Sequence, residues 1–195
     1  MGRWPLLLLA SAVALLVWRG LVAISHREFA PDTTPEGAYA RIALLVAQRH
    51  LDGVFPYLET EAQWAAYTIR DARRKSCDRV RDSYPPGERE RLLAEWRGEA
   101  DAADGEDVFV LLAMRRGWMA RLERDLSGTA HVEIQGERAT VVTARGTRYS
   151  FRRRDNGIWG LTIFSAELEA EAEHASRDLE VVERAAADYA RARAR

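Results

Sequence analysis

The chain has 195 residues, of which 47% are hydrophobic and 30% charged, so it is neither wholly membrane-embedded nor disordered, and its length suits one domain with an appendage. Its 29 Lys and Arg nearly balance its 30 Asp and Glu, whereas a dedicated nucleic-acid binder carries a basic excess. The single cysteine, Cys77, excludes an internal disulfide and a thiolate metal cluster.

An apolar stretch dominates the N-terminus. Residues 4–18 carry no charge, and after a short interruption at Arg19 the apolar run resumes to Ile24. A helix over residues 4–24 would be about 31 Å long, enough to cross a bilayer core, and Arg19 would lie near the headgroups of one leaflet. We predict that residues 1–25 form a signal anchor that contacts the lipid bilayer through residues 4–24.

Two other interpretations of this segment stay open. In one, residues 1–25 are a cleavable signal peptide with Arg3 as its charged start and Ala23 and Ser25 at the cleavage site. In the other, the segment is a buried core helix. An anchor predicts a single-pass inner-membrane protein with its domain on the periplasmic side, and a cleaved signal predicts a secreted or periplasmic protein. The flanking charges are too balanced to fix the orientation by the positive-inside rule.

A linker and a first helix follow the apolar stretch. Residues 26–34 have the composition of a short linker. Thr34 is a good N-cap, Pro35 suits the first helical position, and Glu36 suits the positive end of the helix dipole. The sequence therefore predicts a helix from Pro35 that ends at Asp52-Gly53.

Three further helices are predicted before the strands. The first begins at Thr60, where Gln63 completes a capping-box pattern, and it ends at Pro85-Pro86. A short helix then carries Leu92, Leu93 and Trp96. After a loop at residues 100–105, a single helix is predicted over residues 107–126, with Gly128 as its stop.

The hydrophobic period then changes from 3.6 to 2, which predicts strands. A two-residue turn with Gly136 first sets Ile134 opposite Ala139. A three-residue loop that ends on Gly146 sets Ala139 opposite Phe151. Because a slip of one residue would exchange the two faces, the agreement between turns and apolar positions fixes the predicted register.

A loop that ends on Gly157 completes a four-stranded antiparallel meander, with Phe151 opposite Leu161 and Tyr149 opposite Ile163. The apolar face of the meander carries Val132, Ile134, Ala139, Val141, Tyr149, Phe151, Trp159, Leu161 and Ile163. The other face carries His131, Glu133, Thr140, Arg148, Ser150, Arg152 and Thr162. This one-sided polarity predicts that helices cover only one face of the sheet.

The polar face holds an unfavourable pair of like charges. The predicted register sets Arg138 opposite Arg152, with Arg148 nearby, and opposed like charges are unfavourable unless an anion lies between or over them. The side chains either splay into solvent or meet an acidic partner. One acidic partner within the chain is the group of glutamates that opens its last predicted helix. The three arginines are therefore interaction-surface candidates.

Residues 166–195 are predicted to form one long amphipathic helix, with glutamates at its start and arginines at its end. A seam of three heptads carries Leu168, Ala172, Ala175, Leu179, Val182, Ala186 and Tyr189. This seam either docks on the chain's own domain or pairs with a second copy or an envelope protein. For the second case, the interaction-surface candidates are Leu168, Leu179, Val182 and Tyr189.

The sequence offers few catalytic or cofactor-binding patterns. Its histidines, His26, His50, His131 and His174, fall in different predicted elements, and no phosphate-binding loop or nucleophile elbow occurs. His131 and Glu133 share a strand face that is predicted to be solvated, where pKa tuning is weak. We therefore expect no catalytic residue, no metal and no cofactor. Alternation turns the aromatic residues of 148–154 inward, away from any nucleic acid.

Several short motifs resemble a known superfamily over residues 34–164. They are Thr34-Pro35-Glu36, Val132-Glu133 with Gly136 and Ala139-Thr140-Val141, and Asn156-Gly157 with Trp159. The layout resembles the nuclear-transport-factor-2-like (cystatin-like α+β cone) superfamily, especially its small bacterial exported members. The resemblance implies a cone whose helix–sheet cleft is either filled or holds a ligand. Catalytic members use acidic or histidine residues in that cleft, and none is assignable here. The extra helices between residues 85 and 126 and the C-terminal helix depart from the pattern.

The sequence thus predicts an α+β domain over residues 35–165, followed by the helix of residues 166–195. We expect a membrane-tethered envelope domain that binds or assembles and does not catalyse a reaction. The alternative is a small-ligand binder or an enzyme with a cleft between helices and sheet. The candidate lining of that cleft is Trp64, Tyr67, Tyr149, Phe151 and Trp159.

Overall fold

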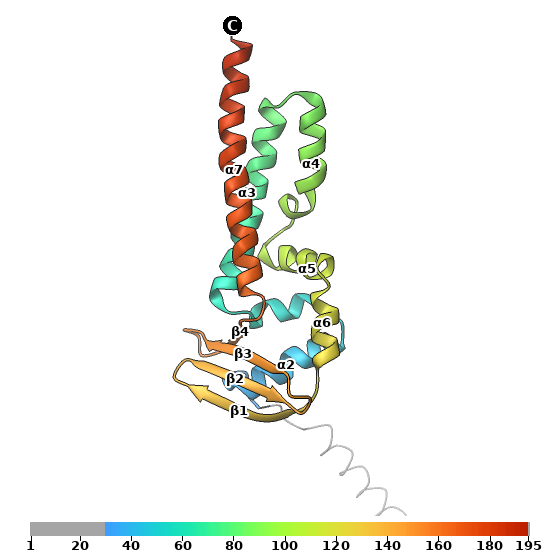
Figure 1. Ribbon diagram of the computed structural model, residues 1–195, viewed down its shortest axis with the longest axis vertical. Coiled ribbons are helices and arrows are strands. Elements are labelled where there is room, and N and C mark those ends of the chain that lie inside the picture. Colours follow the sequence, from blue (N-terminus) through green and yellow to red (C-terminus); the bar gives the residue numbers. More distant parts are fainter. Residues whose placement is uncertain (1–29, 195) are drawn as a thin grey trace, which may run out of the picture. The chain divides into compact units, whose positions relative to one another are not determined.

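The computed structural model describes residues 30–194, so the predicted anchor at residues 1–25 and most of the linker lie outside the described residues. The described residues from Pro31 onward belong to one compact unit. This unit is an α+β fold in which a four-stranded antiparallel sheet packs beneath a group of helices (Figure 1). Over residues 30–194, no helix combines the length and the apolar character that a membrane span requires.

Helix α2 (Pro35–Ala47) begins as predicted. The Thr34 hydroxyl accepts a hydrogen bond from the Gly37 amide at 3.2 Å, and Pro35 occupies the first turn. The helix ends earlier than predicted because Arg49 adopts a left-handed conformation with φ of 60°. The residues that were expected to break the helix instead begin a 3-10 helix, η1 (Asp52–Tyr57).

Helix α3 (Thr60–Ser83) lacks the predicted capping box. Its N-cap is Glu59, whose side chain makes no capping hydrogen bond. The Gln63 amide donates instead to the carbonyls of Phe55 and Leu58, at 2.9 and 3.2 Å. Glu59 is extended, and its N–H donates to the Leu161 carbonyl at 3.1 Å. The helix begins at Thr60 as predicted, but its N-cap is Glu59, so Thr60 lies inside the first turn. Helix α4 (Pro86–Ala100) follows after the predicted proline break.

The helix predicted over residues 107–126 is two helices, α5 (Gly105–Arg115) and α6 (Trp118–Asp125). Gly117 lies between them with φ of 66°, a left-handed conformation that ends an α-helix. Asp104 caps α5 and accepts hydrogen bonds from the two following amides of the first turn, at 2.9 and 3.1 Å. The prediction of one helix was wrong because the hydrophobic period continues across the break.

The sheet has the predicted order and register. Strands β1 (Thr129–Gln135), β2 (Arg138–Thr143), β3 (Arg148–Arg153) and β4 (Trp159–Leu161) follow one another across it. The observed pairs include Ile134 with Ala139, Ala139 with Phe151, and Phe151 with Leu161. Gly136, Gly146 and Gly157 all have positive φ, as the predicted turns require. Strand β4 ends before Ile163, so its predicted ladder pair with Tyr149 does not form.

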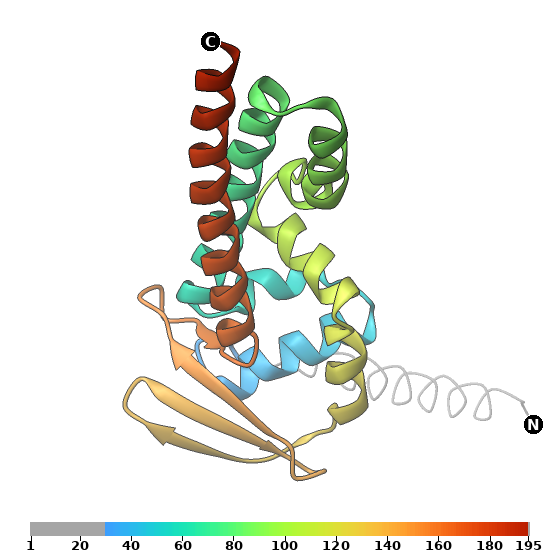
Figure 2. The ribbon, with the colours of Figure 1, turned by 45° about the horizontal axis from the view of Figure 1, so that its top comes forward.

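Helix α2 lies against the apolar face of the sheet (Figure 2), where it contacts β1, β2 and β4. On β2, β3 and β4 the inward residues are buried, among them Val141, Phe151 and Leu161. On β1, Val132 packs against the core but Ile134 is 56% exposed, so the end of β1 near Ile134 is left uncovered. The register also shifts between Thr129 and His131, where β1 has an irregularity.

The other sheet edge is closed by a short bridge. Leu58 pairs in parallel with Leu161 of β4, and the next residue, Glu59, bonds to the same strand. The Leu58–Glu59 backbone approaches β4 so closely that position 160 accommodates glycine alone. A Cβ at Gly160 would lie 2.6 Å from Glu59 Cα and 2.9 Å from the Leu58 carbonyl oxygen. The entry into α3 is therefore fixed against the sheet.

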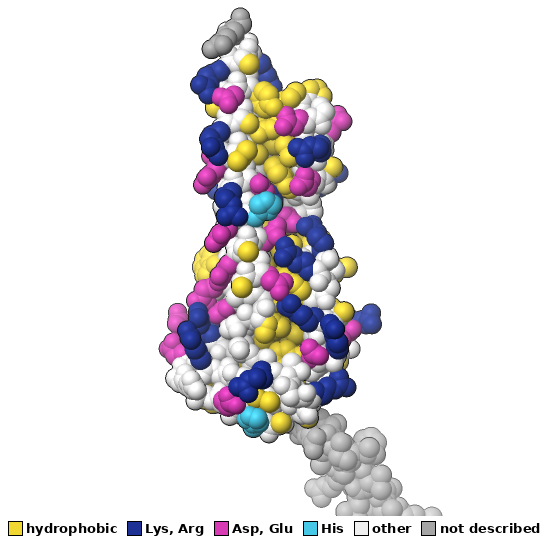
Figure 3. All heavy atoms as spheres, viewed as in Figure 1, with side chains coloured by type: hydrophobic (Ala, Val, Ile, Leu, Met, Phe, Trp, Pro, Cys, Tyr) yellow, Lys and Arg dark blue, Asp and Glu magenta, His cyan; other side chains and the backbone are white. Residues whose placement is uncertain are grey.

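Helix α7 (Ser165–Arg193) packs lengthwise on α3. The heptad seam faces α3: Leu168, Ala172, Ala175, Val182 and Ala186 are buried, and Leu179 and Tyr189 are partly buried. The seam thus docks on the chain's own domain, the first of the two alternatives that the sequence left open. Hydrophobic side chains reach the surface between α7 and α4 near the outer end of these helices (Figure 3).

The buried residues form two hydrophobic clusters. The first joins the sheet, α2, α5 and α6 to the inner halves of α3 and α7, and at its centre the rings of Trp118 and Phe164 stack at 4.6 Å. The second lies between α4 and the outer halves of α3 and α7, and contains Cys77, Val80, Tyr84, Leu92, Trp96, Ala100, Val182 and Ala186.

A buried arginine lies between the two clusters. Arg73 of α3 is 3% exposed. Its Nε donates to Glu99 of α4 at 3.1 Å, and one terminal nitrogen donates to Asp178 of α7 at 2.5 Å. The guanidinium also lies over the ring of Trp96, with 5.0 Å to its centroid. Glu99 accepts a second hydrogen bond, from Arg115 of α5, at 2.8 Å. One cation therefore links three helices.

We predict that Gly160→Ala lowers the free energy of unfolding by about 1–3 kcal/mol, because the new Cβ meets backbone atoms that cannot rotate away. The matched control is Gly98→Ala in α4, where the nearest atom is 4.0 Å away and alanine is expected to stabilise the helix by about 0.5–1 kcal/mol. Urea unfolding of the full chain measures both. Equal effects of the two substitutions would contradict the close approach at Gly160.

Candidate functional site

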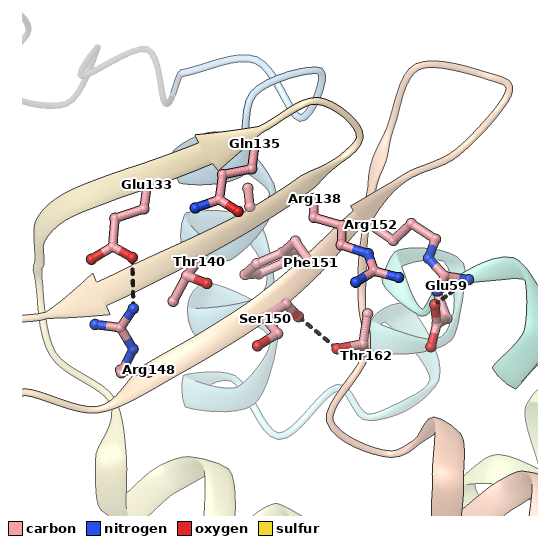
Figure 4. A pocket seen from close by; sticks show the side chains of 11 residues that line it. Glu59, Glu133, Gln135, Arg138, Thr140, Arg148, Ser150, Phe151, Arg152 and Thr162 are labelled. Atoms are coloured by element: carbon pink, nitrogen blue, oxygen red, sulfur yellow. Dashed lines mark hydrogen bonds and ion pairs between the residues drawn. The ribbon is translucent and has the colours of Figure 1, made fainter.

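The outer face of the sheet holds a hollow of about 540 Å³ with a polar lining. Alternation along the strands turns one set of side chains to the core and the other to this face. Figure 4 shows the polar set from outside, while Phe151 turns to the core. The lining includes Glu59, Glu133, Gln135, Arg138, Thr140, Arg148, Ser150, Arg152 and Thr162.

Glu59 comes from outside the sheet. The bridge at Leu58 and the N–H bond of Glu59 to Leu161 hold it beside β4, at the start of α3. Glu59 is 5% exposed, and its carboxylate oxygen Oε2 accepts no hydrogen bond from the described residues. The sequence does not reveal Glu59 as a lining residue, because no local pattern predicts a bridge between segments so distant in the chain.

One end of the hollow is formed by an ion pair. Arg148 donates to Glu133 at 2.6 Å, and His131 lies 3.3 Å from the same carboxylate. The hydrogen bond from Arg148, and then that from His131, lower the pKa of Glu133. Arg148 of the predicted interaction surface is therefore neutralised within the chain.

Arg152 has acidic partners, but not the ones that the sequence suggested. It donates to Glu61 at 2.7 Å and lies 3.5 Å from Glu59, both at the start of α3. The hypothesis that glutamates of the C-terminal helix cover the arginines was wrong. Glu167 of α7 pairs instead with Arg121 of α6 at 3.0 Å. Helix α7 runs along α3 away from the outer face, and the start of α3 is what reaches β3 (Figure 1).

Arg138 stands apart from these pairs. It is directly opposite Arg152 in the β2–β3 ladder, as predicted. Its side chain is exposed and makes no hydrogen bond or ion pair with any residue of the described chain. The outer face therefore carries two paired guanidiniums, those of Arg148 and Arg152, and one without an ion pair among the described residues, that of Arg138.

The structure does not bring together the five residues named for a helix–sheet cleft. Tyr149, Phe151 and Trp159 are packed in the first cluster, each no more than 4% exposed. Trp64 is 67% and Tyr67 is 37% exposed on α3, where the Tyr67 ring packs edge-on against Phe55 of the first cluster and not against the strand aromatics. The sheet is covered by α2, so the aromatic residues of α3 do not meet those of the strands.

Trp64 and Tyr67 line a different hollow. Their ring centroids are 6.3 Å apart, and together with Arg154 and Asn156 they border a surface depression of about 330 Å³. The Arg154 guanidinium donates to the Pro56 carbonyl at 2.6 Å, so this depression lies where the last hairpin loop meets η1 and α3.

The four seam residues named for a partner are occupied within the chain. Leu168 and Val182 are at most 2% exposed, and Leu179 is partly buried. The ring of Tyr189 packs on Tyr84 with 5.0 Å between centroids, and its hydroxyl bonds a carboxylate of α4. The seam is thus not a free surface.

The described residues show no other reactive centre. Burial raises the pKa of the Cys77 thiol, which disfavours the thiolate. In residues 30–194, no three His, Cys, Asp or Glu side chains are grouped as a metal ion would require. His50, His131 and His174 lie in separate parts of the fold, and His26 lies outside the described residues.

Comparison with known proteins returned no relative: no model of a protein family, no curated protein and no solved structure matches the chain. The relation to the nuclear-transport-factor-2-like superfamily therefore stays a hypothesis that rests on the motifs.

We predict that Arg152→Glu lowers the free energy of unfolding by about 1–3 kcal/mol, because it removes the cation beside a buried carboxylate. Combining it with Glu61→Arg restores part of the loss, since the pair is then reversed. Combining it with Glu167→Arg is the control and restores nothing. Urea unfolding of the variants measures this, and recovery with the Glu167 substitution would contradict the assignment of partners.

We predict that Tyr149→Phe raises the free energy of unfolding by about 1 kcal/mol, because the buried Tyr149 hydroxyl has no hydrogen-bond partner among the described residues. Burial raises the pKa of Tyr149 from 10.0 to about 12, so the folded state favours the protonated phenol and loses stability as the pH rises from 10 toward 12. The Tyr149→Phe variant loses less of its free energy of unfolding between pH 10 and pH 12, because it has no phenol at this position to ionise.

Tyr39→Phe is the matched control for this substitution. The Tyr39 hydroxyl donates to the Ser127 carbonyl at 2.7 Å, so its removal is expected to destabilise the fold. Urea unfolding at pH 8 and pH 11 separates the two tyrosines. A destabilised Tyr149→Phe variant would show that the hydroxyl has a partner after all.

Proposed function

We propose that this chain is a non-enzymatic binding or assembly domain of the cell envelope, tethered to the inner membrane by residues 1–25, with its domain on the periplasmic side. The tether is supported by the uncharged apolar run of residues 4–18. The observation that carries the binding role is the outer face of the sheet, where Arg138 is exposed, unpaired and opposed by a second arginine.

The chemistry of the outer face favours binding over catalysis. Glu133, the acid that faces the hollow most openly, is held ionised by its two hydrogen-bond donors, so it is a poor proton donor. The side chains of Arg148 and Arg152 are 56% and 40% exposed, so the face is solvated and offers little of the desolvation that tunes reactive groups.

The packing of the chain also favours the sheet over the C-terminal helix as the contact surface. The heptad seam is covered by α3, and the apolar face of the sheet is covered by α2. Among the described residues, only the start of α3 reaches the outer sheet face, at Arg152 and Gly160, and no helix lies across the rest of it. A partner that binds there would meet polar and charged groups, as is usual at non-obligate interfaces.

A photo-crosslinking residue at position 140 tests this proposal. Thr140 lies on β2 within the hollow. In cells that express the full chain natively, we expect a discrete crosslinked protein adduct from position 140, recovered in the membrane fraction. The control places the same residue at Arg79, which is exposed on the outer half of α3. No adduct from position 140, or the same adduct from both positions, would contradict the proposed role of the sheet face.

A further inference from the structure

We infer that the hollow on the outer sheet face binds an acidic peptide segment, with a Glu or Asp carboxylate on Arg138 and a backbone N–H donating to Glu59. This inference rests on the proposed function, and it adds the chemistry of the partner. It is carried by three features of the lining: an unpaired cation, neutral donors around it, and a buried carboxylate without a hydrogen bond.

The unpaired cation is Arg138. The ladder sets it opposite Arg152, which is already bound to Glu61. Opposed like charges on one sheet face are unfavourable, and an anion that binds one of them removes the conflict. A guanidinium presents parallel N–H groups that match a carboxylate in a bidentate geometry. Arg138 is thus the position on this face where an incoming carboxylate gains the most binding free energy.

Neutral polar side chains surround this guanidinium. Gln135 is the ladder partner of Arg138 on β1, and Thr140 is paired with Ser150 one step along the same face. The side-chain amide and the two hydroxyls form no hydrogen bond with other described residues. They are therefore available as donors to the carboxylate oxygens that Arg138 leaves free.

Glu59 distinguishes a peptide from a simple anion. Its side chain is 6% exposed, and its nearest cation, Arg152, lies at 3.5 Å, beyond ordinary hydrogen-bond length. A buried carboxylate without a hydrogen bond is costly, so it favours a ligand that brings a donor. A peptide backbone offers N–H groups next to its acidic side chains, whereas a fully deprotonated anion such as sulfate offers no donor.

The charged side chains of the hollow limit how much negative charge a ligand can carry there. Glu133 lies at one end of the hollow, and Glu59 lies at the other. Arg138 lies between them. A continuous polyanion such as a nucleic acid would find only one unpaired cation in the hollow, because Arg148 and Arg152 are already paired with carboxylates. A single carboxylate from a peptide, flanked by uncharged backbone, meets only the central cation.

A binding experiment with synthetic peptides tests the inference on the full chain in an uncharged detergent. The probe is a short fluorescein-labelled peptide of alternating Glu and Ala, and its partner probe replaces every Glu by Gln. Fluorescence anisotropy is expected to show at least about tenfold tighter binding of the Glu peptide. A Glu peptide with N-methylated backbone is expected to bind more weakly, because it cannot donate to Glu59.

Two variants separate the site from general electrostatics. Arg138→Gln is expected to weaken binding of the Glu peptide about tenfold, while Arg79→Gln, which removes an exposed arginine that is also unpaired among the described residues, leaves it unchanged. Circular dichroism confirms that both variants fold. Equal binding of the Glu and Gln peptides, or no effect of Arg138→Gln, would overturn the inference. So would displacement by sulfate, an anion without a donor, at the concentration of unlabelled peptide that displaces the probe. If any of these results overturns the inference but crosslinking at position 140 still gives a discrete adduct, the proposed function stands and only the acidic peptide is excluded as the partner.

Discussion

The buried cation of Arg73 determines how the helices are placed. A guanidinium that is 3% exposed is tolerated only where carboxylates surround it, and here they come from Glu99 of α4 and Asp178 of α7. Because α7 leaves the sheet directly after β4, and α3 enters from the residue bound to β4, the two helices start at one sheet edge and run side by side. Arg73 fixes them to each other farther along, so the start of α3 keeps its place beside β3.

The charge pattern of the outer sheet face follows from that placement. The start of α3 supplies Glu59 and Glu61 to Arg152, and β1 supplies Glu133 to Arg148. Arg138, on the strand between them, is out of reach of both. The outer face thus carries three arginines and three glutamates, but two of the arginines take all three glutamates, and Arg138 is left without an ion pair among the described residues. The binding role proposed for the sheet depends on this unpaired arginine.

The sequence predicted the sheet well because strand register is set locally. Turn glycines and alternation determine which residues face each other, and the opposition of Arg138 and Arg152 follows from them. The partner of Arg152 was beyond such reasoning, because Glu61 lies 91 residues away and arrives only through packing of α3. Trp64 was assigned to a cleft because helical periodicity does not say which face of a helix meets a sheet. The break at Gly117 was missed because apolar spacing runs through it.

The bridge between Leu58 and Leu161 has a consequence for how the sheet meets other strands. It occupies the β4 edge, which leaves β1 as the open edge of the described sheet. An open edge is a template for uncontrolled pairing with other chains. Here the edge strand carries His131 and Glu133 and an irregular register at its start, all features that discourage growth into aggregates. The sheet is thus protected by closure on one side and by charge and irregularity on the other, while its polar face stays accessible.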